Sequence, residues 1–140
     1  MQRLFFVLVA LAVTCFAAAA VQAAVVIHID IGSQQMSVTK DDEPVYRFAV
    51  STGKPGYGTP TGTFGIKKLV RYYHSKKYDS PMPHSIFFKG DAYAIHGTSA
   101  VSQLGSPASH GCVRLAPGNA AALFALVKNN RGNTRVIITR

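Results

Sequence analysis

Short apolar segments separated by turn residues restrict the fold of this chain more than any other feature. "VVIHIDI" (25–31), "QQMSVTK" (34–40) and "PVYRFAVS" (44–51) are rich in β-branched and aromatic residues and are bounded by turn-forming residues. In the first segment His28 and Asp30 fall on one face, whereas the other face carries only valine and isoleucine. The pattern predicts a meander of β-hairpins, with His28 on the solvent side of its strand rather than acting as a ligand.

The remainder of the chain predicts more strands and one helix. Strand-like segments occur at 63–69, 85–88, 92–97 and 134–139. Only "PGNAAALFALVKNN" (117–130) spaces its apolar residues as a helix does. These elements favour a mainly β fold with one short helix.

Two segments are predicted to be loops. The segment 51–69 is rich in Gly and Pro before its strand-like end, and such loops often carry binding groups on a rigid sheet. "RYYHSKKYDSPMP" (71–83) is predicted to be a surface loop in which His74 is solvated. Its tyrosines either cover a pocket as a lid or pack the rim of that pocket.

The N-terminus has the three parts of a secretory signal peptide. Arg3 precedes an uncharged apolar run from Leu4 to Val21, and small residues follow up to Ala23. The run is about as long as the shortest membrane-spanning helix, so a retained membrane anchor is the alternative. We expect cleavage after Ala23, which makes 1–23 the signal peptide and 24–140 a single domain with no membrane span.

The positive charge of the chain is dispersed. The formal charge is +9, and Arg3 is the only charged residue of the predicted signal peptide. A positive surface attracts polyanions, and for an exported protein these would be anionic envelope polymers. The charge could equally serve solubility alone. No arginine-rich block or interleaved aromatic run supports a nucleic-acid partner.

Cys112 is the only cysteine left once the signal peptide is removed, so it cannot form an internal disulfide. A thiol becomes a strong nucleophile as a thiolate, which needs a base nearby. His96, at the end of a predicted strand, is favoured over His110 as that base. The carbonyl of Gly97 could fix the tautomer of the imidazole, and a turn at Gly111 could aim backbone amides at an oxyanion. This set of groups predicts acyl transfer through a thioester.

Two other interpretations of these residues remain open. A lone cysteine in a small β domain can be an inert, buried residue. Cys112, His96 and His110 could also bind zinc, but the chain has no C-x-x-C or H-E-x-x-H motif. We therefore expect no metal and no cofactor.

"IHGTSAVSQLGSPASHGCVRL" (95–115) resembles the signature of the L,D-transpeptidase catalytic domain of the YkuD type. "STGKPGYGTPTGTFGI" (51–66) is similar to the turn-rich segment of the same family. The resemblance implies a β-sandwich-like fold with one short helix after the catalytic cysteine. It also implies action on peptidoglycan stem peptides, at the bond between the L-centre of diaminopimelate and a terminal D-alanine.

The resemblance gives each residue of the motif a role. It implies that Cys112 is the nucleophile, that His96 is the general base and that the carbonyl of Gly97 orients this base. The backbone amides of the segment from His110 through Gly111 to Cys112 would hold the oxyanion.

The resemblance also places Ser109 and Arg114 at polar positions that flank the motif and could bind substrate. Arg114 stands where an asparagine is common in the family. Its guanidinium could pair with a substrate carboxylate or brace the loop.

Together these observations predict an exported cysteine L,D-transpeptidase of the periplasm or cell wall. It would form a thioester at Cys112, release D-alanine and transfer the acyl group to an amine. A hydrolytic relative, such as an L,D-carboxypeptidase or an enzyme that removes crosslinks or protein attachments, is the alternative within the same chemistry. A non-catalytic basic module that binds the envelope is the alternative from another class.

Overall fold

The computed structural model describes residues 13–18 and 23–140, so most of the predicted signal peptide lies outside the described residues. In the described part, the chain forms nine strands, one α-helix and two short 3-10 helices. The strands are β1 (Val25–Asp30), β2 (Gln35–Lys40), β3 (Glu43–Ala49), β4 (Gly62–Phe64), β5 (Lys68–Ser75), β6 (Ser80–Lys89), β7 (Tyr93–Gly97), β8 (Val113–Leu115) and β9 (Thr134–Thr139). The helices are α1 (Pro117–Lys128), η1 (Val101–Gln103) and η2 (Arg131–Asn133).

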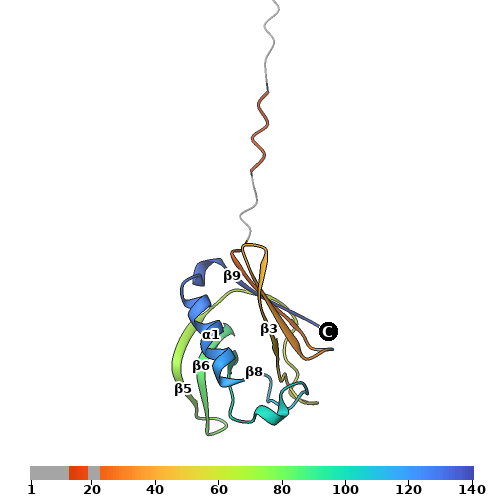
Figure 1. Ribbon diagram of the computed structural model, residues 1–140, viewed down its shortest axis with the longest axis vertical. Coiled ribbons are helices and arrows are strands. Elements are labelled where there is room, and N and C mark those ends of the chain that lie inside the picture. Colours follow the sequence, from red (N-terminus) through yellow and green to blue (C-terminus); the bar gives the residue numbers. More distant parts are fainter. Residues whose placement is uncertain (1–12, 19–22) are drawn as a thin grey trace, which may run out of the picture.

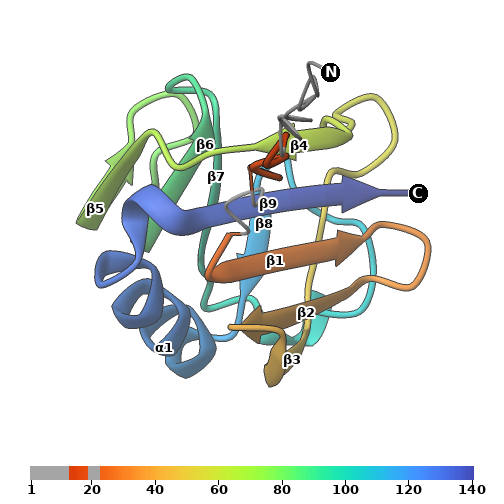
Figure 2. The same ribbon diagram turned by 90° about the horizontal axis from the view of Figure 1, so that it is seen from above.

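Two sheets form the scaffold (Figure 1). The five-stranded sheet has the order β3-β2-β1-β9-β4, and the four-stranded sheet has the order β5-β6-β7-β8. The first three strands form antiparallel hairpins, and β9 returns from the C-terminal end to pair parallel with β1. In the view of Figure 2, the five-stranded sheet lies in front of β7 and β8, and α1 lies to one side. The helix contacts β6 and β7.

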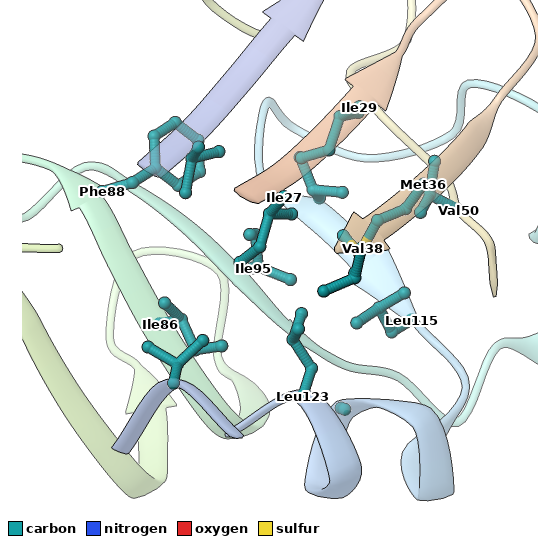
Figure 3. Close-up of a cluster of buried hydrophobic side chains, with 14 of the residues drawn as sticks. Ile27, Ile29, Met36, Val38, Val50, Ile86, Phe88, Ile95, Leu115 and Leu123 are labelled. Carbon is teal, nitrogen blue, oxygen red and sulfur yellow. The ribbon is translucent and has the colours of Figure 1, made fainter. Parts of the chain in front are cut away.

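The main core lies between the two sheets and under the helix (Figure 3). Ile27 and Ile29 come from β1, Ile86 and Ile95 from the four-stranded sheet, and Leu123 from α1, and all five are almost completely buried. Because side chains alternate along a strand, each sheet contributes one face to this core and leaves the other for different contacts. A second, smaller cluster of Met82, Phe87 and Ala94 is separate from the main core.

The prediction of a mainly β fold with one short helix is confirmed. The helix begins at Pro117 as expected, and the predicted strand 134–139 matches β9. His28 is partly exposed on β1, and its Nε2 lies 2.9 Å from Oγ1 of Thr139. The segment 63–69 does not form one strand, because Phe64 ends β4 in one sheet and Lys68 begins β5 in the other.

The prediction of a surface loop at 71–83 is wrong. Most of this segment belongs to β5 and β6, which form an antiparallel hairpin with its tip at 76–79. Pro81 and Pro83 lie within β6, in a part that pairs with β5 but not with β7. On the side of β6 that has no neighbouring strand here, a proline removes no hydrogen bond of the sheet, so the strand tolerates it.

None of the helices in residues 13–18 and 23–140 has the length and apolar character needed to span a membrane.

Candidate active site

The predicted nucleophile and base come from two neighbouring strands. β7 and β8 are parallel, and Ile95 pairs with Val113 while His96 pairs with Arg114. Ile95 and Val113 belong to the main core, so the alternating residues, which include Cys112, point to the opposite face of the sheet. Cys112 packs there against the smaller cluster of Met82, Phe87 and Ala94.

A cavity of about 800 Å³ lies over this outer face. The hairpin tip, the beginning of β7 and the loop before β8 all contribute to its wall. Five of the seven predicted site residues line it, namely His96, Ser109, His110, Cys112 and Arg114. The fold therefore brings together side chains that are up to 18 positions apart in the sequence.

His96 is buried and has a fixed orientation. Its Nδ1 lies 2.7 Å from the carbonyl oxygen of Gly97. A carbonyl can only accept, so Nδ1 carries the proton and the lone pair of Nε2 is available. Burial lowers the pKa of His96 from 6.5 to about 4; the Gly97 hydrogen bond opposes this shift, and the charge of Arg114 adds to it. The imidazole is therefore neutral near pH 7.

Cys112 is partly buried and protonated near pH 7. Burial raises the pKa of its thiol and outweighs the backbone hydrogen bond of Ala94 and the charge of Arg114, which both lower it. The thiol lies 3.8 Å from the carbonyl oxygen of Ala92, a weak hydrogen-bond contact. Among the hydrogen bonds of the described residues, none joins this thiol to His96. The resting pair is therefore neutral rather than a thiolate beside an imidazolium.

The cysteine loop, defined as residues 109–112, is tied together by Ser109. The buried Oγ of Ser109 accepts a hydrogen bond from the Gly111 N–H at 3.0 Å and donates one to the Cys112 carbonyl at 2.5 Å. Gly111 has φ +120°, and a Cβ at this position would lie 2.9 Å from the ring of Tyr93. Its amide already donates to Ser109, so in this arrangement it is not available to a substrate oxyanion.

A buried polar network that the sequence analysis missed supports this loop. The carbonyl of Thr52 accepts from the Ser109 N–H, and the hydroxyl of Thr59 donates to the carbonyl of Gly111 at 2.8 Å. Gln34, at the turn between β1 and β2, binds both the backbone N–H and the hydroxyl of Thr52. The turn-rich segment 51–69 is thus a support for the cysteine loop. The composition of 51–69 predicted a loop that carries binding groups, but no local pattern in the sequence pointed to these contacts.

His110 and Arg114 contact different neighbours at the cavity. The ring of His110 stacks on Tyr78 at 4.2 Å between centroids and meets Tyr57 edge-on at 4.9 Å. Arg114 donates from Nη1 to Oε1 of Gln103 in η1 at 3.0 Å. Arg114 therefore lines the cavity while its guanidinium is bound to η1.

Within the part of the chain that the structure describes, no three His, Cys, Asp or Glu side chains gather closely enough to hold a metal ion.

Residues 24–138 match the family model of the L,D-transpeptidase catalytic domain, also called YkuD. The chain belongs to this family. A curated relative, the YkuD protein of Bacillus subtilis strain 168, is 26% identical over 117 residues, which cover 81% of this chain and 65% of that protein.

Solved structures of L,D-transpeptidases share the fold. One from Mycobacterium smegmatis is 26% identical with a TM-score of 0.73, and the match covers 84% of this chain and 59% of the other. Another, solved in complex with imipenem, is 23% identical with a TM-score of 0.75 over 84% of this chain and 59% of the other. This L,D-transpeptidase domain thus spans less than two thirds of the length of each of these relatives.

Proposed function

We propose that this chain is an exported cysteine L,D-transpeptidase that acts on peptidoglycan stem peptides. The observation that carries the proposal is the buried His96, with Nδ1 bound to Gly97, in the same cavity as Cys112. A neutral base whose Nε2 can accept a proton, in the same cavity as a thiol, is the arrangement that nucleophilic catalysis needs. Family membership supports the same class of reaction.

In the first step, the thiol of Cys112 attacks the carbonyl carbon of the diaminopimelate residue that precedes D-alanine. As the carbon–sulfur bond forms, Nε2 of His96 takes the thiol proton, so neither group has to be charged beforehand. The Nδ1 hydrogen bond to Gly97 steadies the imidazolium that results. Because the Gly111 amide is engaged with Ser109, we expect the Cys112 N–H to be the donor to the oxyanion.

In the second step, the tetrahedral intermediate collapses and its carbon–nitrogen bond breaks. His96 returns the proton to the leaving amine of D-alanine, which leaves a thioester on Cys112 and a neutral imidazole. An acceptor amine then attacks the thioester, His96 takes its proton, and the thiol leaves with that proton. Water in place of the amine would give hydrolysis, the alternative within the same chemistry.

Incubation of the protein with a stem tetrapeptide, followed by mass analysis of the products, tests the proposal. Transfer predicts a crosslinked dimer and free D-alanine, whereas hydrolysis predicts a tripeptide and free D-alanine with no dimer. The Cys112→Ala variant should fold and give neither product. Product formation by Cys112→Ala at the rate of the wild type would contradict the proposal.

The location of the protein is part of the same proposal. Residues 1–23 would be a signal peptide, and the domain 24–140 would work in the periplasm or cell wall, where stem peptides are found. The mass and N-terminal sequence of the protein from its native compartment test this directly. A mature chain that begins at Ala24 is expected, and an intact Met1 would contradict cleavage.

A further inference from the structure

Two lysines lie beside His110, each over a tyrosine ring. Nζ of Lys54 is 5.1 Å from the ring centroid of Tyr57, and Nζ of Lys77 is 5.3 Å from that of Tyr78. Both rings also contact the imidazole of His110. We call these five residues the lysine–tyrosine cluster. It joins the turn-rich segment, the hairpin tip and the cysteine loop.

The cluster adjoins the nucleophile. Lys77, Tyr78, His110 and Cys112 all line the same cavity. Burial lowers the pKa of His110, and the charges of Lys54, Arg114 and Lys77 lower it further. These cations are therefore close enough to His110 to act on it. Their combined field makes the cavity positive beside His110.

Neither lysine of the cluster has an acidic partner within the described residues. Lys68 forms a salt bridge with Asp91 at 2.6 Å, and Asp79 is hydrogen-bonded to His74 at 2.8 Å. The acid that lines the cavity and the acid of the hairpin tip thus contact other side chains than Lys54 and Lys77. An ammonium group over a tyrosine ring is held weakly and keeps N–H donors for an incoming anion.

We propose that Lys54 and Lys77 form a subsite that binds the free carboxylates of the stem peptide and discriminates against their carboxamides. The inference rests on the proposed function and names a feature of its substrate. Glutamate and diaminopimelate of a stem peptide each keep a carboxyl group that is outside the peptide backbone. A compact ammonium recognises such a group as a point charge, whereas the amide is neutral. Lys77, Tyr78 and His110 line the cavity that also holds Cys112, and Lys54 adjoins them through Tyr57, so we expect the anion bound there to belong to the substrate.

The test measures binding rather than turnover, in the Cys112→Ala protein. Two stem tetrapeptides are compared that differ only in carrying carboxylates or carboxamides on glutamate and diaminopimelate. Calorimetry should give about tenfold tighter binding of the carboxylate peptide, as expected for two exposed charge pairs. Adding Lys54→Met and Lys77→Met should bring the two dissociation constants within about twofold of each other. Only the binding of the carboxylate peptide should become weaker.

A matched control is Lys40→Met with Lys128→Met, which removes the same charge from exposed positions on β2 and α1. This variant should keep the tenfold preference. Equal binding of the two peptides, no binding of either, or a preference that survives the loss of Lys54 and Lys77 would each overturn the subsite. So would a finding that the two lysines affect binding of an anionic wall polymer but not of the peptides. Discrimination in binding together with no product from the wild-type enzyme would instead count against the proposed reaction.

Discussion

Nδ1 of His96 lies 2.7 Å from the carbonyl oxygen of Gly97, the residue that follows it in β7. This bond sets the tautomer that leaves Nε2 free to accept a proton. The position of the carbonyl depends in turn on packing, because a Cβ at Gly97 would lie 3.2 Å from Cγ of Pro83 and 3.3 Å from Cβ of Ala120. β6 and α1 therefore close on the backbone that orients the base.

The variant Gly97→Ala tests this packing. The added methyl has to push β6 or α1 away, so we expect a loss of about 1–3 kcal/mol in the free energy of unfolding and lower kcat/KM. Gly118→Ala is the matched control, since a Cβ there meets no atom within 4 Å. Urea denaturation and transpeptidation assays measure both effects. If both variants were as stable and as active as the wild type, the carbonyl would not depend on close packing.

The depressed pKa of His96 predicts acid sensitivity of the fold. The unfolded imidazole takes up a proton near pH 6.5, whereas the folded one does so only near pH 4. Between these values the unfolded state binds more protons, so stability falls as the pH drops, by about 3 kcal/mol in all. The free energy of unfolding is measured by urea denaturation from pH 7 to pH 4. The His96→Gln variant should not show this loss of stability, whereas the exposed control His74→Gln should retain it. Parallel curves for wild type and His96→Gln would contradict a buried, neutral His96.

Thr59 is expected to stabilise the cysteine loop through its hydroxyl. The hydroxyl accepts from the Gly53 N–H at 2.9 Å and donates to the Gly111 carbonyl at 2.8 Å, and the side chain is buried. Thr59→Val leaves both backbone groups without this partner and should cost about 2–4 kcal/mol of unfolding free energy. Thr61→Val, at an exposed position of the same segment, should change it by less than about 0.5 kcal/mol. Equal urea midpoints for the two variants would show that the Thr59 bonds do not support the loop.

The raised pKa of Cys112 predicts a slow thiol in the free protein. Burial keeps the thiol protonated to a higher pH than its ordinary 9.0, so little thiolate exists at pH 7. The rate of iodoacetamide labelling is quantified on the peptide that contains Cys112. This rate should rise tenfold per pH unit through pH 8 and reach no plateau below pH 9. The same peptide in urea-unfolded protein should react faster. A plateau near pH 7 would indicate a preformed thiolate and contradict the neutral resting pair.

The strands and their buried faces could be predicted where alternation is regular. The segment 25–31 has β-branched residues at every second position, and its apolar face is the one buried in β1. The hairpin of β5 and β6 was missed for two reasons. Tyr72 and Tyr73 are adjacent, which breaks the alternation, and β6 contains two prolines, which usually indicate a loop. Tyr72 is an aromatic residue that is 82% exposed, so the alternation of apolar and polar residues that identifies a strand is missing here.

The residues of the candidate site could be predicted where residue type and motif mark them, but not where they depend on contacts between distant segments. Cys112 and His96 stand out by residue type and by the motif, and the register of β7 with β8 brings them to one face. The roles of Gln34 and Thr52 depend on contacts between segments 18 residues apart, which no local pattern encodes. The same holds for the engagement of the Gly111 amide, since it depends on the side-chain conformation of Ser109.

Mass spectrometry of the intact protein after exposure to a carbapenem tests the central claim most directly, because a strained β-lactam carbonyl reports on the nucleophile without the natural substrate. We expect the mass of one carbapenem to be added at Cys112, with no adduct on the Cys112→Ala variant and much slower addition to the His96→Gln variant. An unmodified wild-type protein, or an adduct that persists after Cys112 is replaced, would contradict a catalytic thiol at this position.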